Sequence, residues 1–245
     1  MTRLIQWDVD RTLLVGGGVG VAAYAAAFTA VTGLAWRGDL VAAGRTDLSI
    51  TPELFAQHGI DDSGPYLEPF FARYTDEFAA RAGQLAEHGV LLPGVAGVLA
   101  ALHAHPDVVQ TLVTGNIAAV GVGKVTAFGL QGWLETGIGG YGDDHAVRTE
   151  LVRRSRERAE SAYGPFDDAD VLVVGDTVHD VGAALGAGVT AVGVATGPAS
   201  APELAAAGAH HVLDDLADVD AVVALLAGDP ARGRGRYAGV ADRPA

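Results

Sequence analysis

Runs of apolar, β-branched residues recur along the chain and predict the strands of a sheet. Each run ends in small or acidic residues, and the runs lie at residues 4–7, 108–113, 171–174, 189–194 and 212–213. Ala- and Leu-rich segments at helical spacing separate most of them, for example residues 95–103 and 117–130. Strands that are apolar throughout and alternate with helices are typical of a parallel sheet covered on both faces. We therefore predict a doubly wound α/β fold.

The long segment between the first two strands predicts an inserted unit. It spans roughly a hundred residues, far more than one crossover helix needs. Residues 22–35 and 66–88 have helical spacing, and a turn-rich middle lies around residues 44–52 and 59–65. We interpret this segment as an α-helical insertion after the first strand.

These patterns divide the chain into three parts. The core is predicted to comprise residues 1–15 and 90–228, and the helical insertion is predicted to comprise residues 16–89. Residues 229–245 are rich in Gly, Arg, Pro and Ala without periodicity, which is typical of a flexible tail.

Composition removes several classes of function. A chain that is 49% hydrophobic does not stay disordered, and the absence of cysteine excludes disulfides and thiol catalysis. A net charge of −14 argues against a nucleic-acid or anionic-membrane partner, because both need a basic face. An acidic chain can still bind a small phosphorylated metabolite when a divalent cation screens the charge. The expected partner is therefore a small molecule, and the chain is expected to be a monomer or a homodimer.

One uncharged stretch, Thr12–Trp36, is long enough to span a bilayer. It is rich in Gly and Ala, with little Leu or Ile, and the acidic residues before it are unlike a signal peptide. We therefore expect a helix of the globular fold here, no membrane contact and a cytoplasmic location.

Acidic residues follow two of the predicted strands. Asp8 and Asp10 lie just after the first, on the same side of an extended chain, and Asp176 and Asp180 follow the third. Read singly, these residues could be a capped strand end and a helix N-terminal carboxylate. If the two strand ends meet, however, the carboxylate oxygens form the kind of cluster that Mg²⁺ prefers.

The second strand is followed by Thr114, Gly115 and Asn116. A hydroxyl, a glycine and a helix N-terminus together can bind phosphate oxygens. The alternative is an ordinary helix N-cap at Asn116.

With these motifs in order, the chain resembles the haloacid dehalogenase-like (HAD) hydrolases, in the branch similar to phosphoglycolate phosphatases. The resemblance covers most of residues 3–216, and its motifs are Asp8-x-Asp10-x-Thr12, Thr114-Gly115-Asn116, and Gly175-Asp176-x-x-x-Asp180. Pro93-Gly94-Val95 and Gly44-Arg45-Thr46-Asp47 also match. The resemblance implies a Rossmann-like core with a helical cap, and a Mg²⁺-dependent phosphatase acting on a small phosphomonoester.

The resemblance also implies a role for each residue. Asp8 would be the nucleophile that forms an aspartyl-phosphate, and Asp10 the acid and then the base. Thr114, with the amides of Gly115 and Asn116, would bind the phosphoryl oxygens. The metal ligands would be Asp8, the backbone carbonyl of Asp10, and Asp176, with Asp180 acting behind them.

Three basic residues remain to be placed. The family needs a cation at the phosphoryl group, and we predict Arg148, because one helix and one strand separate it from Asp176. Lys124 is predicted to be a surface cation, because it lies well into the helix that leaves the strand ends. Arg45 is predicted to bind a substrate carboxylate or phosphate; its alternative is a local Arg–Asp pair in a surface turn.

The sequence departs from the family at Arg11, where the family usually has Gly. This side chain could contact the leaving group or face solvent. Other functions also stay open: a dehalogenase that uses Asp8 without metal, a phosphomutase of the same family, or a non-catalytic metabolite-binding protein on the same fold. The dehalogenase fits poorly, because Asp10 and Asp176 supply what phosphoryl transfer requires.

Overall fold

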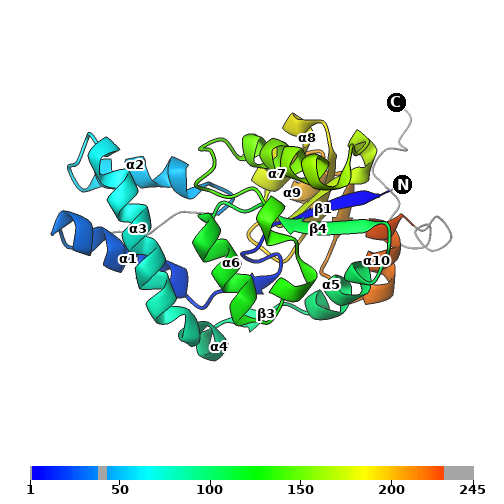
Figure 1. Cartoon of the computed structure of the whole chain (residues 1–245), viewed down its shortest axis with the longest axis horizontal. Coiled ribbons are helices and arrows are strands. Elements are labelled where there is room, and N and C mark those ends of the chain that lie inside the picture. The colour runs from blue at the N-terminus through cyan, green and yellow to red at the C-terminus, as the bar shows by residue number, and fades with distance from the viewer. Residues whose placement is uncertain (1, 38–42, 229–245) are drawn as a thin grey trace.

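The computed structural model describes residues 2–37 and 43–228, and its centre is a five-stranded parallel sheet (Figure 1). The predicted tail, residues 229–245, lies outside the described residues. The strands run in the order β4-β1-β5-β6-β7 and are β1 Arg3–Trp7, β4 Val108–Leu112, β5 Val171–Gly175, β6 Thr190–Val194 and β7 His211–Leu213. All five runs predicted from apolar patterning are strands, so the predicted α/β class is confirmed.

Helices cover both faces of the sheet, because alternate residues of each buried strand point to opposite sides. On β1, Ile5 and Trp7 pack into the core beneath the sheet as drawn in Figure 1, and Leu4 packs into the core above it. The lower layer contains α5 Val95–His103, α6 Ala118–Ala127 and α10 Val219–Ala227. The upper layer contains α7 Arg148–Tyr163, α8 Val178–Ala187 and α9 Ala201–Ala206. Short 3₁₀ turns lie at η2 Gln131–Trp133, η3 Thr136–Ile138 and η4 Asp168–Asp170.

The segment between β1 and α5 forms a helical unit beside the sheet, at the left of Figure 1. Two short antiparallel strands join it to the core, β2 Leu14–Val15 and β3 Val90–Leu91. Its helices are α1 Val19–Thr32, α2 Asp47–Gln57, α3 Gly64–Arg81, η1 Ala82–Gln84 and α4 Leu85–His88. We refer to this unit as the cap.

Helix α2 corrects the prediction of a turn-rich middle in the insertion. Pro52 lies inside this helix, where it removes one backbone hydrogen bond. Two features offset that loss. The Thr46 hydroxyl caps the helix by accepting from the Ser49 amide, and Leu54 and Phe55 are buried in the cap core.

The cap has an aromatic core of its own. Phe28, Phe55 and Phe70 have no exposed surface, and Phe55 packs edge to face against the other two rings, with centroids 5.2 and 5.5 Å away. Ile117 and Val120, at the start of α6, belong to the same cluster, so the cap core continues onto the sheet-bearing unit. In the described part of the chain, no helix is long and apolar enough to cross a membrane.

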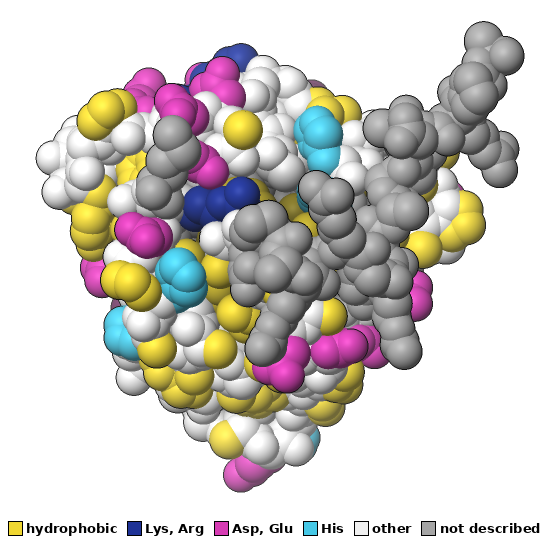
Figure 2. Space-filling view, turned by 90° about the vertical axis from the view of Figure 1, so that its right-hand side faces the viewer, with side chains coloured by type: hydrophobic (Ala, Val, Ile, Leu, Met, Phe, Trp, Pro, Cys, Tyr) yellow, Lys and Arg dark blue, Asp and Glu magenta, His cyan; other side chains and the backbone are white. Residues whose placement is uncertain are grey.

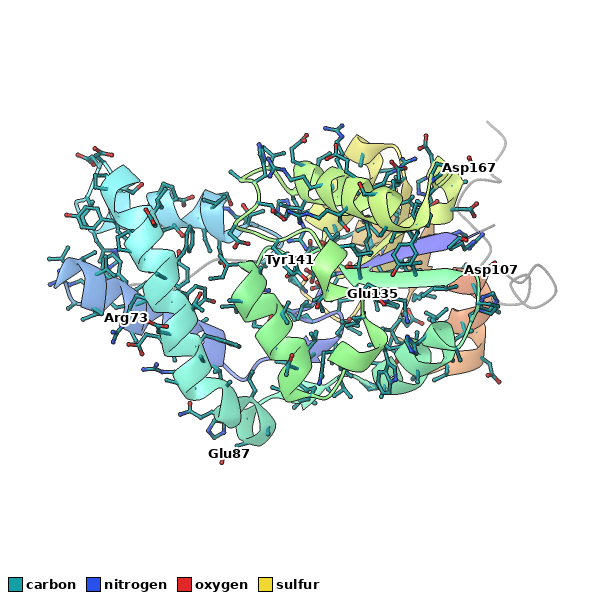
Figure 3. The ribbon with its side chains drawn as sticks, viewed as in Figure 1. Arg73, Glu87, Asp107, Glu135, Tyr141 and Asp167 are labelled. Atoms are coloured by element: carbon teal, nitrogen blue, oxygen red, sulfur yellow. The ribbon has the colours of Figure 1, made fainter. Side chains whose placement is uncertain are left out.

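The topology brings three loops to one edge of the sheet. β1 lies between β4 and β5, so the residues that follow these three strands meet beneath the cap. In open α/β sheets, ligands bind beyond the carboxyl ends of the strands, at the point where the connections of two neighbouring strands leave to opposite sides of the sheet. The opposite end of the molecule carries Asp107 and Asp167 (Figure 3). On the face at that end, outside the grey atoms, acidic side chains are widespread and basic ones form only small patches (Figure 2).

Candidate active site

Asp8 lies at the centre of the site, immediately after β1, and is only 6% exposed. Its backbone amide continues the sheet by donating to the Val174 carbonyl of β5 at 2.9 Å. The Arg148 guanidinium reaches it from the start of α7: Nη2 is 2.6 Å from Asp8 Oδ1 and 2.6 Å from Asp180 Oδ1. One arginine nitrogen therefore holds two carboxylates from different strand ends.

Asp180 has two functions in this arrangement. Its Oδ2 accepts from the Thr177 amide and hydroxyl, at 3.0 and 2.7 Å, which closes a capping box at the start of α8. Its Oδ1 pairs with Arg148. Asp180 is therefore both a helix N-terminal carboxylate, as in the alternative interpretation, and a partner of Arg148 in the site.

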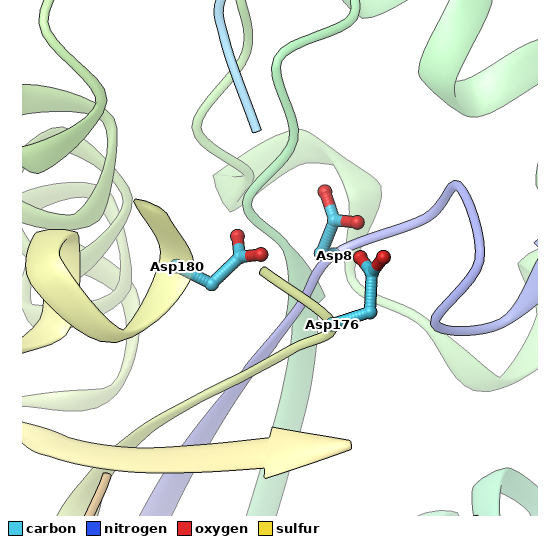
Figure 4. A group of neighbouring side chains, drawn as sticks. All are labelled: Asp8, Asp176 and Asp180. Atoms are coloured by element: carbon cyan, nitrogen blue, oxygen red, sulfur yellow. The ribbon is translucent and has the colours of Figure 1, made fainter. Parts of the chain in front are cut away.

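Asp8, Asp176 and Asp180 form a buried carboxylate cluster, in which one oxygen of each lies within 4.8 Å of the others (Figure 4). Thr12 donates from its hydroxyl to Asp176 Oδ1 at 3.3 Å, whereas the buried Asp176 Oδ2 has no hydrogen-bond partner in the described structure. Gly197 permits this position, because a Cβ there would lie 1.6 Å from Asp176 Oδ2. The cluster thus contains an unsatisfied buried oxygen.

The electrostatics of this cluster favour bound positive charge. Burial raises the pKa of Asp8 well above its ordinary value; Arg148 opposes this rise, and the neighbouring aspartates add to it. Burial, followed by repulsion from Asp180, raises the pKa of Asp176 to about 7. Three carboxylates share one guanidinium, so a cation would lower the cost of keeping them ionised.

Asp10 is not part of this cluster and is held by Lys124 and Asn116. Lys124 Nζ lies 2.7 and 2.6 Å from the two Asp10 oxygens, and Asn116 Nδ2 donates to Asp10 Oδ2 at 2.8 Å. Lys124 also donates to Asn116 Oδ1 at 2.8 Å. Burial opposes ionisation of Asp10, but the Lys124 charge and these hydrogen bonds outweigh it and lower the pKa.

The prediction that Lys124 is a surface cation is wrong: the residue is 5% exposed and lies in the site. The helical rise measures only the distance between backbone positions. The lysine side chain is long and leans back toward the helix N-terminus, which spans the remaining distance to Asp10. A sequence signal was present, since Lys124 is the only lysine in the chain and the only charged residue between Ile117 and Leu130.

The loop after β4 supplies a hydroxyl and an amide. Thr114 is buried, and its Oγ1 accepts from Asn116 Nδ2 at 2.8 Å. Asn116 does not cap α6, because Ile117 is the N-cap residue, and the amides at the start of the helix donate to Asp47 and Asp143 instead. The alternative interpretation of Asn116 as a helix cap is therefore wrong, and its side chain instead joins Thr114 to Asp10.

Arg45 lies at the edge of the site, just before α2, and its side chain is held by residues of that helix. Its Nη2 donates to Glu53 Oε2 at 2.7 Å, across an ion pair whose side chains are 33% and 55% exposed. Its carbonyl packs on the core: a Cβ on Gly115 would lie 1.9 Å from the Arg45 oxygen. The alternative interpretation of Arg45 was a local ion pair with an aspartate. The guanidinium does form a local ion pair, but its partner is Glu53.

Asp47 fastens the cap to the loop after β4, a function that sequence reasoning did not assign. Its backbone amide donates to the Gly115 carbonyl at 2.8 Å, and its Oδ2 accepts from the Ile117 amide at 2.8 Å. The carboxyl is buried, and burial raises its pKa to about 7. The Ile117 amide and Lys124 oppose this rise, whereas Asp10 and Asp143 add to it.

This shift predicts a pH-dependent stability difference for Asp47→Asn. Because the folded-state pKa is raised, Asp47 stabilises the fold fully below its unfolded pKa of 3.8 and loses that contribution as pH rises to about 7. Asparagine keeps the oxygen that accepts from Ile117 and cannot ionise. We expect the variant to equal the natural protein near pH 4 and to be more stable by about 1–4 kcal/mol above pH 7.

Thermal unfolding of both proteins from pH 4 to pH 8, in EDTA, measures this difference. The other aspartates with raised pKa values are present in both proteins, so their contributions cancel. A difference in unfolding free energy that does not change with pH would contradict the assignment.

A cavity of about 470 Å³ lies between the sheet edge and the cap, within the size range of small-ligand sites. Its lining brings together all the predicted site residues except Asp180, which contacts Arg148. Its cap side contains Arg45, Asp47 and Tyr74. Tyr74 is 3% exposed and was not predicted, because its place in an aromatic helix pattern does not distinguish a core side chain from a cavity wall.

Comparison with known proteins agrees with this architecture. The family model described as HAD-hydrolase-like matches residues 148–219, which begin at Arg148 and include Asp176 and Asp180. No curated protein sequence matches the chain.

Solved structures share the fold over most of the chain. A hydrolase from Pseudomonas syringae is 20% identical, with a TM-score of 0.65; the match covers 89% of this chain and 96% of that one. CbbY from Rhodobacter sphaeroides, solved with phosphate, is 21% identical, with a TM-score of 0.68 and the same two coverages. Residues 148–219 match a family model of HAD-like hydrolases, and most of the chain shares its fold with solved structures of hydrolases and phosphatases, so the chain is similar to the haloacid dehalogenase-like hydrolases.

Proposed function

We propose that the protein is a Mg²⁺-dependent phosphatase that hydrolyses a small phosphomonoester through an aspartyl-phosphate. One observation carries this proposal: Asp8 with Arg148, Asp10 with Lys124, Thr114 and Asp176 all line one cavity. The arrangement supplies a nucleophile, a proton carrier, donors for phosphoryl oxygens and a place for a metal.

In the proposed reaction, a carboxylate oxygen of Asp8 attacks phosphorus, and the ester P–O bond breaks. Asp10 donates a proton to the departing oxygen, so the alcohol leaves neutral. Asp10 then accepts a proton from water as that water attacks phosphorus, which releases inorganic phosphate and restores Asp8. Lys124 and Asn116 hold the Asp10 carboxylate at the same cavity as Asp8 and lower its pKa, which supports its role as the base. The acid step requires Asp10 to enter the reaction protonated.

The transferring group needs donors for its oxygens. Arg148 supplies a fixed positive charge at Asp8: burial alone would lower its pKa, but the charges of Asp180 and Asp8 outweigh burial and hold that pKa above its ordinary value. Thr114, Gly115 and Asn116 line the same cavity, where the Thr114 hydroxyl and the two following amides would serve as such donors. Such fixed donors stabilise charge without reorganisation during the reaction.

The carboxylate cluster fits a divalent metal. Asp176 Oδ2 is buried and unpartnered, while Asp180 is already engaged by Arg148 and Thr177. Asp8 and Asp176 would therefore hold the ion, with the Asp10 carbonyl, and Asp180 would position Arg148 from behind. Oxygen ligands favour Mg²⁺, which when bound offsets the repulsion between a carboxylate and a phosphate dianion.

Structures of similar fold bind related ligands. CbbY from Rhodobacter sphaeroides has been solved with phosphate and, as a mutant, with xylulose-1,5-bisphosphate. A protein described as a beta-phosphoglucomutase from Bacteroides vulgatus is 17% identical, with a TM-score of 0.66. The ligands of CbbY support a phosphorylated substrate for this protein, and residues of the cap would determine which one it accepts.

Metal removal tests the proposal. We expect Mg²⁺-supported hydrolysis of p-nitrophenyl phosphate to fall at least about 100-fold in EDTA and to return on adding Mg²⁺, because the phosphate dianion must approach Asp8. Asp176→Asn should raise the Mg²⁺ concentration needed for half-maximal activity. The matched control Asp167→Asn, at the far end of the core in Figure 3, should leave it unchanged. Equal activity with and without EDTA would contradict a metal-dependent phosphatase.

The same assay separates a phosphatase from a phosphomutase. A phosphatase releases inorganic phosphate in step with the alcohol, whereas a mutase returns the phosphoryl group to another substrate oxygen. We expect stoichiometric phosphate release from a sugar phosphate. Isomerisation of that sugar phosphate without phosphate release would favour the mutase.

A further inference from the structure

Arg11 occupies a backbone conformation that disfavours its side chain. Its φ is +63°, and it is the only non-glycine residue with positive φ in the described part of the chain. The turn imposes this angle: the Arg11 amide donates to the Leu14 carbonyl at 2.7 Å, and its carbonyl accepts from Thr196 Oγ1 at 2.5 Å. Glycine adopts this conformation without steric cost, so an arginine here sacrifices local stability.

Arg11 is one of the residues that line the active-site cavity. It follows directly on Asp10, the residue proposed to protonate the leaving oxygen, and Gly20 and Val21 of the cap line the same cavity. The cavity volume, about 470 Å³, leaves space beyond a phosphoryl group for the rest of a small substrate.

Arg11 differs from the other cations of the cavity in having no acidic partner. Arg148 is paired with Asp8, Lys124 with Asp10 and Arg45 with Glu53. Among residues 2–37 and 43–228, by contrast, no carboxylate forms an ion pair with Arg11. In a chain of net charge −14, a strained and uncommitted cation at the active site is suited to an anion supplied from outside.

We propose that Arg11 determines substrate specificity by binding a second anionic group of the substrate, carried on the part that leaves with the ester oxygen. The inference rests on the proposed phosphatase function. The substrate class is then a phosphomonoester that also bears a carboxylate or a second phosphate, since a guanidinium can bind either group through two parallel hydrogen bonds.

Matched substrate pairs test this assignment. 3-Phosphoglycerate and glycerol 3-phosphate differ in having a carboxylate or a hydroxymethyl group, and fructose 1,6-bisphosphate and fructose 6-phosphate differ by one phosphate. We expect the natural protein to prefer the anionic member of at least one pair in kcat/KM. Arg11→Gln should reduce that preference by about 10- to 100-fold, the effect of one charge-assisted hydrogen bond, and Arg11→Lys should retain part of it.

Arg154→Gln is the matched control, because it removes the same charge from an exposed position of α7 outside the cavity. It should leave the preference unchanged. Arg11→Gly should also raise Tm, by about 2–4 °C for each kcal/mol of relieved strain. The pair that responds to Arg11→Gln identifies the anion as a carboxylate or a phosphate.

Calorimetric binding in an Asp8→Asn background separates the two proposals, since it needs no turnover. A binding preference for the anionic member that Arg11→Gln abolishes supports the inference even if hydrolysis is absent, and the missing hydrolysis would then refute only the phosphatase. Equal binding of both members of each pair, or a preference that survives Arg11→Gln, would overturn the inference.

Discussion

Asp8→Asn should reduce the hydrolysis of any phosphomonoester substrate by about 10⁴-fold or more while the protein stays folded. An amide oxygen cannot form the acyl-phosphate that the proposed route requires, and removing a nucleophile commonly eliminates almost all of the chemical acceleration. The residual rate should respond little to Mg²⁺, because metal and nucleophile act in the same step. Steady-state kinetics with p-nitrophenyl phosphate, with and without Mg²⁺, measures both effects.

The folded state of this variant is expected to survive for electrostatic reasons. Asp8 is buried near Asp176 and Asp180, and its raised pKa reports the cost of its charge there. A neutral amide of the same shape removes that repulsion, while Arg148 keeps Asp180 as a partner. Tm in EDTA should therefore be unchanged or higher. A folded Asp8→Asn protein with full Mg²⁺-dependent activity would exclude the aspartyl-phosphate route.

Lys124→Met should lower kcat by about 10²-fold or more, with a smaller change in KM. The lysine ammonium holds both oxygens of Asp10, and general acid–base catalysis contributes about 10²- to 10⁴-fold when the group is correctly placed. Methionine retains most of the buried side-chain volume and removes the charge. Asn116 alone would then hold the Asp10 carboxylate, which becomes free to rotate.

The stability of this variant should change less than its activity. The Asp10 side chain is 43% exposed and keeps its hydrogen bond to Asn116, so its charge stays partly solvated when the lysine is removed. Arg154→Met serves as the control for the loss of one positive charge, because Arg154 is exposed and lies outside the cavity. Activity of Lys124→Met within twofold of the natural protein would show that the contact with Asp10 has no part in turnover.

The contrast between Arg148 and Lys124 shows where sequence reasoning succeeds and where it stops. The position of Arg148 follows from counting elements, since one helix and one strand return the chain to the sheet edge that carries Asp176. The place of Lys124 depends instead on the direction and length of one side chain. Backbone distance along a helix does not describe that direction, although a single lysine within an apolar helix was a usable signal.

The cap shows the same boundary. Its existence follows from the length of the segment between two strands, but helix α2 was missed, because Gly44, Pro52 and the threonines around them have turn-like local preferences. Burial of Leu54 and Phe55 in the aromatic core decided in favour of the helix. The contacts of Asp47 with Gly115 and Ile117 join residues far apart in sequence, and no local pattern indicates them.

The sequence by itself determined the parallel sheet and the residues that carry the proposed chemistry. Apolar runs indicate buried strands, and polar residues directly after such a run lie at the end of the strand. This inference uses only the local sequence and does not depend on the packing of the other elements. Tertiary structure alone decided which charges pair: Arg148 with Asp8 and Asp180, Lys124 with Asp10, Arg45 with Glu53, and Arg11 with no acidic partner in the described part of the chain. The physical reason is range, because side-chain pairing depends on ångström-scale distances that the three-dimensional packing of all elements sets together.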